Sequence, residues 1–274
     1  MPKRRIDTLL AERGLFESRT RAAASVMAGE VRVGGPEGRR AAKPGELVDP
    51  DEPLVVQERP PYVSRGGIKL ANALSATGLA VAGRRALDIG ASTGGFTDCL
   101  LQRGAREVVA VDVGYGALDY RLRRDPRVQL LERTNARLLD PAALPPARDG
   151  SPAPPDLAVI DVSFISLAKV LPAVLSCLAL PYDVLALVKP QFELGPGRVG
   201  KGGVVRDPDA RREALLAAGL AAVSLGAAVR AYVSSGLPGP KGNRESFAWL
   251  GPQPEGVGPQ DAATLAPLVG EAEP

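Results

Sequence analysis

Four ionisable residues stand at positions where side chains could act on a substrate: Lys69, Asp161, Lys189 and Glu245. Asp161 and Lys189 end the strand-like runs LAVID and VLALVK. Lys69 lies in a predicted helix, and Glu245 lies in the alternating run GNRESFAWL, which is typical of a strand. Because the carboxyl ends of strands in an open α/β sheet meet at the ligand crevice, Asp161 and Lys189 are predicted to face one pocket.

Two lysines and two carboxylates together suit the activation of a hydroxyl group. A hydroxyl is a poor nucleophile until its proton is accepted or oriented, and an amine held by carboxylates can do this. Taken alone, each residue is more often a surface charge or a salt-bridge partner, above all Lys69 and Glu245. The order Lys–Asp–Lys–Glu and the strand-end placement favour a catalytic set, and they leave open which lysine accepts the proton.

A glycine-rich turn follows a strand-like run and opens a helix in the string ALDIGASTGGFTD. Glycines let the backbone approach a ligand closely, and a helix N-terminus offers free N–H groups. Asp112, at the end of the next strand, can accept both ribose hydroxyls of an adenosine cofactor. The Asp-Ile-Gly form that begins at Asp88 lacks the GxGxxG spacing, so it indicates S-adenosylmethionine rather than a nicotinamide cofactor. A plain strand–helix turn is the alternative.

A second glycine-rich run, GPGRVGKGG at 195–203, comes close to a phosphate-binding loop. Gly195, Gly200 and Lys201 have the GxxxxGK spacing, but position 202 is Gly where a Ser or Thr would hold magnesium. We therefore interpret the run as a mobile loop near the substrate rather than as an NTPase site.

The composition excludes several kinds of chemistry. The chain has 274 residues, no histidine, and two cysteines, Cys99 and Cys177. Histidine-based mechanisms are therefore excluded, and neither a metal site nor a disulfide framework is predicted. Hydrophobic residues make up 45% and charged residues 24%, which is typical of a globular protein. No signal peptide or membrane span is evident, so we expect a cytoplasmic protein.

The chain divides into a small module and a larger domain. Two short helices and a few small strands come first, and helix and strand signals alternate after them. Short apolar strands separated by helices indicate an α/β fold with a doubly wound parallel sheet. We predict domains at residues 1–59 and 60–252, a Pro-rich surface loop at 140–156, and a disordered tail at 253–274.

Basic residues are concentrated at the start of the chain. Residues 1–43 hold ten Lys or Arg against five Asp or Glu, whereas residues 44–58 hold five acids and no base. A basic head is the usual electrostatic footprint of a nucleic-acid contact, although a solvated pair of helices could look the same.

Several strings resemble the TlyA family of bacterial 2'-O-ribose methyltransferases, which is sometimes labelled haemolysin A. They are SRGGIKL, LDIGASTGGFTD, VDVGYG, IDVSFISL, VKPQFE, VGKGGVVRD and GNRESFAW, and the resemblance covers about residues 3–250. It implies a small α+β S4-like RNA-binding domain followed by an FtsJ-like, Rossmann-like class I methyltransferase sheet. It also implies methylation of cytidine 2'-hydroxyls of ribosomal RNA from S-adenosylmethionine.

The resemblance also implies roles for individual residues. The family's Lys–Asp–Lys–Glu tetrad falls on the four residues named above. The implied cofactor contacts are Gly90, Ser92, Gly94, Gly95, Phe96, Asp112 and Asn135. At Asn135 the sequence departs from the Asp that the wider FtsJ-like group has there.

The basic head is then expected to recruit RNA through phosphate contacts, which position the RNA without reading its sequence. The candidate residues are Lys3, Arg4, Arg5, Arg19, Arg21 and Arg32. A solvated helix face is the alternative for any one of them. The expected partner is ribosomal RNA within ribosomal subunits, and we expect a monomer with no membrane partner.

Three other functions compete with this interpretation: a cytolysin, as the older label suggests, an RNA-binding protein without catalysis, and a methyltransferase for a small molecule or a protein. The sequence offers no spanning helix, amphipathic hairpin series or secretion signal for the first. All four tetrad positions are occupied, which disfavours the second, and the basic head disfavours the third. The sequence identifies neither the target nucleotide nor the ribosomal subunit.

Overall fold

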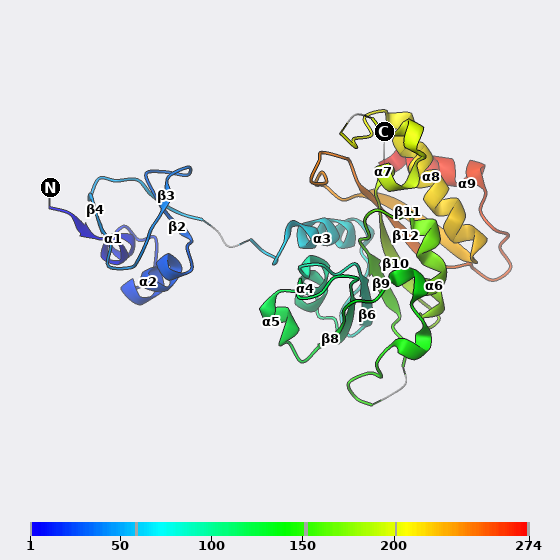
Figure 1. Ribbon diagram of the computed structural model, residues 1–274, viewed down its shortest axis with the longest axis horizontal. Coiled ribbons are helices and arrows are strands. Elements are labelled where there is room, and N and C mark those ends of the chain that lie inside the picture. The colour runs from blue at the N-terminus through cyan, green and yellow to red at the C-terminus, as the bar shows by residue number, and fades with distance from the viewer. Residues whose placement is uncertain (1, 58–59, 151–152, 201, 273–274) are drawn as a thin grey trace. The chain divides into compact units, whose positions relative to one another are not determined.

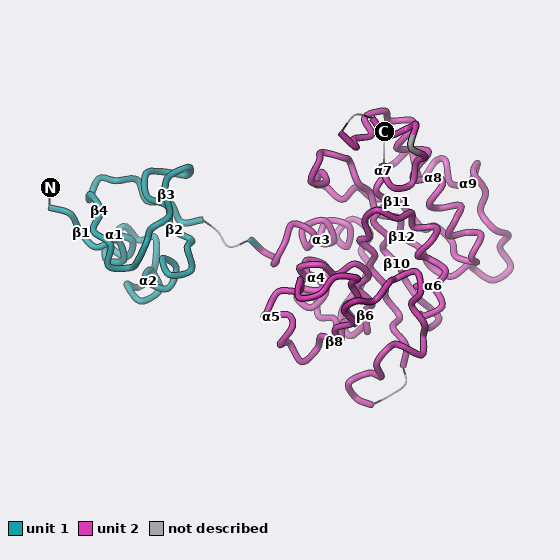
Figure 2. Tube along the Cα trace, in the orientation of Figure 1, with its two compact units in different colours: residues 1–60 teal, residues 61–274 magenta. Residues whose placement is uncertain are grey.

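The computed structural model describes residues 2–57, 60–150, 153–200 and 202–272. It divides the chain into two compact units, residues 1–60 and 61–274, which Figure 2 shows in different colours. The predicted junction after residue 59 lies one residue from this division. Lys201 of the glycine-rich run 195–203 lies outside the described residues.

Unit 1 is a small α+β module built on two short helices. They are α1 (Ile6–Glu12) and α2 (Arg19–Met27), and the Ser18 hydroxyl caps α2 by accepting a hydrogen bond from Arg21 N at 3.2 Å. The strands are β1 (Arg4–Arg5), β2 (Val31–Val33), β3 (Arg39–Arg40), β4 (Leu47–Val48) and β5 (Leu54–Val56). Apolar residues of both helices and of β2 form one buried cluster. The two predicted helices and the small strands after them are therefore confirmed, but β1 precedes the helices, where no strand was predicted.

Unit 2 is organised around a seven-stranded sheet. Its strands are β6 (Arg85–Ile89), β7 (Glu107–Val111), β8 (Val128–Leu131), β9 (Leu157–Ile160), β10 (Asp183–Val188), β11 (Ala227–Ser234) and β12 (Ser246–Pro252). The spatial order is β11-β12-β10-β9-β6-β7-β8. The strands from β10 to β8 pair in parallel, whereas β12 pairs antiparallel with both β10 and β11. The predicted α/β fold is confirmed, with β12 as the antiparallel exception.

Helices cover both faces of this sheet (Figure 1). The α-helices are α3 (Arg65–Thr77), α4 (Gly95–Gln102), α5 (Tyr120–Arg123), α6 (Leu171–Ser176), α7 (Pro190–Glu193), α8 (Pro208–Ser224) and α9 (Ala262–Ala272). The 3₁₀ helices are η1 (Ala136–Leu138), η2 (Pro141–Ala143), η3 (Leu167–Lys169) and η4 (Pro196–Arg198). Within the described residues, no helix is long and apolar enough to cross a membrane.

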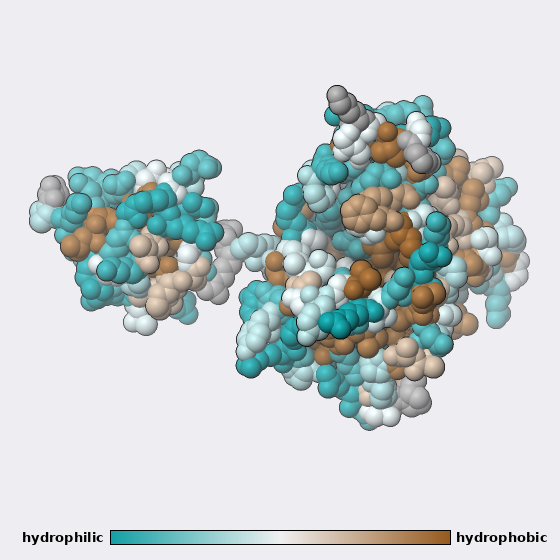
Figure 3. Space-filling view, in the orientation of Figure 1, coloured by the Kyte–Doolittle hydropathy of each residue, from teal (hydrophilic) through white to brown (hydrophobic). Residues whose placement is uncertain are grey.

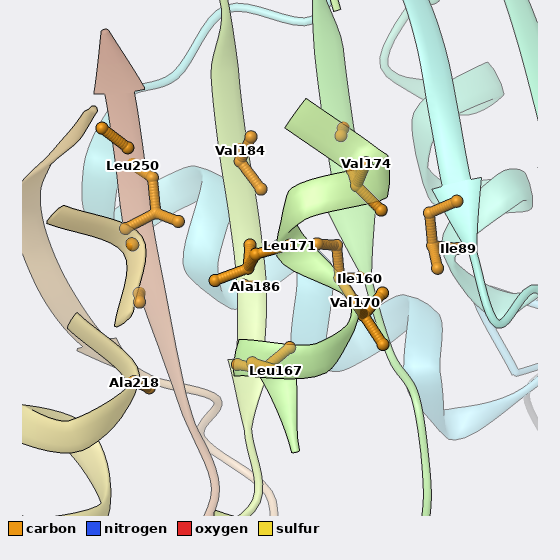
Figure 4. Packing of buried hydrophobic residues seen from close by; sticks show 14 of the residues in the cluster. Ile89, Ile160, Leu167, Val170, Leu171, Val174, Val184, Ala186, Ala218 and Leu250 are labelled. Carbon is orange, nitrogen blue, oxygen red and sulfur yellow. The ribbon is translucent and has the colours of Figure 1, made fainter. Parts of the chain in front are cut away.

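Two separate hydrophobic clusters lie on the two faces of the sheet. One joins α3 and α4 to the sheet through residues such as Leu70 and Leu100. The other joins α6, α8 and α9 to the opposite face, where Leu171 and Val174 pack beside Ile160 and Val184 (Figure 4). Because each apolar strand is covered on both faces, its sequence is continuously apolar rather than alternating.

The tail differs from the prediction. Residues 253–274 were expected to be disordered, but α9 occupies half of this stretch and buries Leu265 and Val269 in the cluster of α6 and α8. Their spacing of four residues places both side chains on one helical face. The Gly-, Pro- and acid-rich composition before α9 obscured this short apolar stripe.

Candidate active site

A cavity of about 750 Å³ opens at the carboxyl ends of β6, β9 and β10. Its volume lies within the range of sites that bind small molecules and cofactors. The walls include Lys69, Asp161, Lys189 and Glu245, which were selected from the sequence as a catalytic set. The structure therefore brings these four residues, which are spread over most of unit 2, to one cavity.

Lys69 and Glu245 form the deeper of two ion pairs. Lys69 projects from α3, and Glu245 lies immediately before β12. The Lys69 Nζ atom donates a hydrogen bond to Glu245 Oε2, and both side chains are buried. Burial of both charges is tolerated because each neutralises the other.

Lys189 and Asp161 form the second ion pair. Asp161 follows β9, and Lys189 follows β10 and precedes α7. The Lys189 Nζ atom lies 2.5 Å from Asp161 Oδ1 and donates a hydrogen bond of 2.9 Å to Ser163 Oγ. The side chain of Asp161 is 26% exposed and that of Glu245 is 1% exposed. The second pair is therefore the more accessible to a substrate.

The glycine-rich turn lies between the second pair and α4. Gly90 has a φ of +83°, and a Cβ atom there would overlap the carbonyl oxygen of Asp161. Position 90 therefore requires glycine for its backbone conformation and for its close approach to the end of β9. Gly90, Ser92, Gly95 and Phe96 all line the cavity.

Gly94 and Phe96 have a second role in packing. A Cβ atom on Gly94 would overlap Leu122, and Gly94 is not among the residues that line the cavity. Phe96 is buried and packs against Phe247 of β12, with ring centroids 5.8 Å apart. These contacts fix the start of α4, so they hold the turn in place.

Asp112 and Asn135 do not line this cavity. The carboxylate of Asp112 accepts hydrogen bonds from the Ser92 and Gly114 backbone N–H groups, each 2.7 Å long. Asp112 therefore contacts the glycine-rich turn directly. Asn135 is exposed, and its Oδ1 atom accepts a hydrogen bond of 3.1 Å from Arg137 N at the start of η1. The neighbouring Thr134 N donates a hydrogen bond of 3.0 Å to the Asp112 carbonyl oxygen, so the chain at Asn135 runs close to Asp112.

Asp88 is a buried carboxyl group beneath the turn. Its Oδ2 atom accepts a hydrogen bond of 2.6 Å from Thr97 Oγ1, and its Oδ1 atom has no partner among the described residues. Burial raises the pKa of Asp88 to about 7, and the nearby negative charges of Asp161 and Asp112 act in the same direction. The neutral form of Asp88 is therefore populated near neutral pH, where an ordinary exposed aspartate is ionised.

Several residues that line the cavity were not selected from the sequence. Ser163 and Phe164 follow Asp161, and Gln191 and Phe192 follow Lys189. Phe164 is 90% exposed, and its ring centroid lies 5.2 Å from that of Phe192. The strings IDVSFISL and VKPQFE contain all four residues, but local sequence gives no signal that the two strings lie side by side.

The predicted RNA-binding residues of unit 1 differ in exposure. Lys3, Arg4, Arg5, Arg19 and Arg21 are exposed, whereas Arg32 is half-buried and donates a hydrogen bond to the Gly38 carbonyl oxygen. Hydrophilic residues cover most of the visible face of this unit in Figure 3.

One buried carboxylate organises two of these arginines. Asp7 accepts a hydrogen bond of 2.7 Å from Arg5 Nη2 and one of 3.1 Å from Arg19 Nε, both at Oδ2. The hydrogen bonds from Arg5, followed by those from Arg19, hold the pKa of Asp7 well below its usual range. Arg5 and Arg19 are therefore fixed side by side with much of each guanidinium group exposed.

Two family patterns match the chain. The pattern of the FtsJ-like methyltransferases matches residues 62–252, and the pattern of the S4 domain matches residues 4–54.

Whole proteins are similar over most of the chain. A Mycobacterium tuberculosis protein named 16S/23S rRNA (cytidine-2'-O)-methyltransferase TlyA is 52% identical over 249 residues, which is 90% of this chain and 89% of that protein. Hemolysin A of Brachyspira hyodysenteriae is 39% identical and covers 89% of this chain and 98% of its own. A solved structure from Streptococcus thermophilus, whose description names a hemolysin, has a TM-score of 0.70 at 41% identity and covers 99% of this chain and 96% of its own.

Proposed function

This chain belongs to the FtsJ-like methyltransferases that carry an N-terminal S4 domain, the TlyA family, and from that premise we propose that it methylates cytidine 2'-hydroxyls of ribosomal RNA. The observation that carries the proposal is the meeting of two lysine–carboxylate pairs and a glycine-rich turn in one cavity. The pairs offer proton-accepting groups for a hydroxyl, and the turn offers a cofactor surface beside them.

We assign S-adenosylmethionine to the turn, where it would supply an activated methyl group. The residues present fit this cofactor in two respects. Gly90 lines the cavity without a side chain, and each carboxylate oxygen of Asp112 accepts one N–H group and keeps a further acceptor position for a ribose hydroxyl. Ser92, Gly95 and Phe96 complete this side of the cavity.

We assign contact with the ribose hydroxyl to Lys189. Its neighbour Asp161 is the more accessible carboxylate, so a substrate that enters the cavity meets this pair first. In its neutral amine form, Lys189 Nζ would accept the hydroxyl proton as the hydroxyl oxygen bonds in line to the methyl carbon and displaces S-adenosylhomocysteine. Asp161 and Ser163 orient the amine from two sides. The buried pair of Lys69 and Glu245 lines the same cavity.

Unit 1 would recruit the RNA. Arg5 and Arg19, held together by Asp7, present two guanidinium groups that suit bidentate contacts with phosphate. Lys3, Arg4 and Arg21 add exposed positive charge, whereas Arg32 is less accessible. Ribosomal RNA within a subunit is the proposed partner, and the cytoplasm is the proposed location because ribosomes work there. We propose that the protein acts as a monomer.

The test is methyl transfer to separated ribosomal subunits. Wild-type protein, Lys189→Ala and Lys169→Ala are incubated with methyl-labelled S-adenosylmethionine, and the RNA is digested to nucleosides. Lys169 is an exposed lysine outside the cavity, so it serves as the matched control. We expect label in 2'-O-methylcytidine with wild type and the control, and its loss with Lys189→Ala.

Two results would support other functions. Tight binding of cofactor and RNA without transfer to any subunit would favour an RNA-binding protein without catalysis. Release of dye from lipid vesicles by pure protein would favour the cytolysin that the hemolysin labels of two relatives suggest.

A further inference from the structure

Two short segments lie side by side at the wall of the cavity. The first, here called the β9 segment, comprises residues 161–167 after β9, and the second is Lys189 with α7 after β10. Lys189 contacts Asp161 and Ser163, and the rings of Phe164 and Phe192 lie against each other. These contacts all involve residues that line the cavity.

Glu193 adds a contact between the same two segments outside the cavity. Its Oε2 atom accepts a hydrogen bond of 2.7 Å from Ser166 Oγ, and its Oε1 atom accepts one of 2.9 Å from Leu167 N. Burial raises the pKa of Glu193. The proposed mechanism assigns this half-buried carboxyl group no part, yet both of its oxygens are engaged.

One residue of the β9 segment has a strained backbone conformation, which contacts with the surrounding structure must stabilise. Phe164 has a φ of +64°, which a residue with a side chain adopts at a cost in energy. Such a conformation persists where the surroundings fix it from both sides. On the N-terminal side, Asp161 N donates a hydrogen bond of 2.8 Å to the Ile89 carbonyl oxygen. On the C-terminal side, Glu193 holds Ser166 and Leu167.

We propose that Glu193 is a positioning residue for methyl transfer: it fixes the C-terminal end of the β9 segment, so that Ser163 and Asp161 stay in contact with Lys189. This inference rests on the proposed function, because it assigns Glu193 a part in the same reaction. Glu193 acts through Ser166 and Leu167 and does not touch the substrate.

The proposal separates catalysis from cofactor binding. Release of the β9 segment would let Phe164 relax and would move Ser163 away from Lys189. The glycine-rich turn belongs to β6 and α4 and has its own anchors at Asp112 and at the Val111 carbonyl oxygen, which accepts hydrogen bonds from Gly90 N and Ala91 N. Loss of the Glu193 carboxylate is therefore expected to lower kcat and to leave cofactor affinity unchanged. Misplacement of reacting groups by about 1 Å can lower a rate on the order of 100-fold.

The experiment compares three variants of the full-length protein. Glu193→Ala removes the contact. Glu193→Gln keeps an acceptor for Leu167 N and offers an amide N–H group to Ser166 Oγ. Asp261→Ala is the matched control, because Asp261 accepts hydrogen bonds from the hydroxyl and the backbone N–H of Thr264 near the start of α9, away from the cavity.

Three quantities are measured for each variant: kcat for methyl transfer, the Kd of S-adenosylmethionine, and hydrogen exchange at the Leu167 amide. We expect Glu193→Ala to lower kcat roughly 10- to 100-fold, to leave Kd unchanged, and to accelerate exchange at Leu167. Glu193→Gln restores most of kcat and of the protection, and Asp261→Ala changes neither.

The proposal is overturned if Glu193→Ala exposes the Leu167 amide while kcat stays at the wild-type value. It is also overturned if kcat and cofactor affinity fall together, or if Glu193→Gln is as inactive as Glu193→Ala. A wild-type protein that transfers no methyl group to any RNA contradicts the proposed function itself. In that case the exchange rate still shows whether Glu193 holds the β9 segment.

Discussion

The two ends of the seven-stranded sheet both carry buried pairs of opposite charge, but the pairs differ in what surrounds them. At the amino end, Arg85 and Glu107 begin adjacent strands and are each 3% exposed. At the carboxyl end, Lys189 pairs with Asp161 and Lys69 pairs with Glu245 on the walls of a cavity.

The amino-end pair is enclosed by the chain. Arg85 donates to Glu107 and Gln129 and to the carbonyl oxygens of Pro145 and Ala153. Glu107 also accepts a hydrogen bond from Arg148 N. These contacts anchor the Pro-rich segment 140–156, which was predicted only as a surface loop. Because arginine does not lose its proton, Arg85 can hold a loop but cannot act as a base.

The lysine–carboxylate pairs at the carboxyl end of the sheet can take part in proton transfer. Lysine is a compact cation whose amine can exchange a proton, and Lys189 and Asp161 face space that a substrate can enter. In this sheet, opposite charges at strand ends are suited to catalysis only at the end where the cation is a lysine and where a cavity adjoins the pair.

The largest effect is expected on the rate of methyl transfer, when the lysine of a carboxyl-end pair is replaced by arginine, which is the cation of the amino-end pair. Lys189→Arg keeps a cation beside Asp161 but removes an amine that can accept a proton. We expect methyl transfer to fall roughly 100- to 10,000-fold, with the melting temperature unchanged. Initial rates with methyl-labelled cofactor measure this. A variant with wild-type activity would show that Lys189 acts through its charge alone, and the comparison would then fail.

The converse change is at the amino end. Glu107→Ala leaves Arg85 buried without its carboxylate, so we expect a loss of about 3–5 kcal/mol in the free energy of unfolding. Urea denaturation measures this loss. Methyl transfer per folded molecule, assayed at low temperature, should stay at the wild-type value, because Glu107 lies at the opposite end of the sheet. A fall in kcat with unchanged stability would contradict a purely structural role.

Asp88 differs from all of these pairs because it is a buried carboxyl group near the site with no cation partner among the described residues. Its pKa is raised to about 7, so the folded state holds its proton more tightly than the unfolded state. Stability linked to Asp88 is therefore fully present below about pH 4 and is lost as the pH rises through 7. We expect Asp88→Asn, which stays neutral, to be more stable than wild type by a few kcal/mol at pH 8 and similar to it at pH 4. Thermal melts across this range measure the difference, and parallel curves would contradict it.

The smallest effect is expected in unit 1, where charge pairs leave arginine exposed. Arg19 pairs with Asp7, Arg21 pairs with Glu17, and both arginine side chains remain more than half exposed. Reversal of both to Glu should weaken RNA binding about tenfold or more at moderate salt and leave cofactor affinity unchanged. Filter binding at several salt concentrations measures this. Equal loss of RNA and cofactor binding would indicate misfolding of the variant instead.

The amino-acid sequence alone was enough to predict the α/β architecture and to select all four residues of the lysine–carboxylate set. The places of the strands, though not their exact ends, followed from apolar runs such as LAVID and VLALVK, since local side chains decide whether a segment can be buried on both faces. The glycine at position 90 and the strand-end places of Asp161 and Lys189 were also readable, because parallel strands share one carboxyl edge.

The contacts between residues far apart in the sequence depend on the tertiary structure and could not be predicted from local patterns. Lys69 and Glu245 are 176 positions apart, and their contact depends on the antiparallel insertion of β12 beside β10. The contact of Glu193 with Ser166 likewise depends on the pairing of β9 with β10. The helix in the tail was missed because its two buried residues gain their stability from α8 and the sheet. Local sequence patterns predict which residues are buried. The order of strands in the sheet determines which residues they pack against.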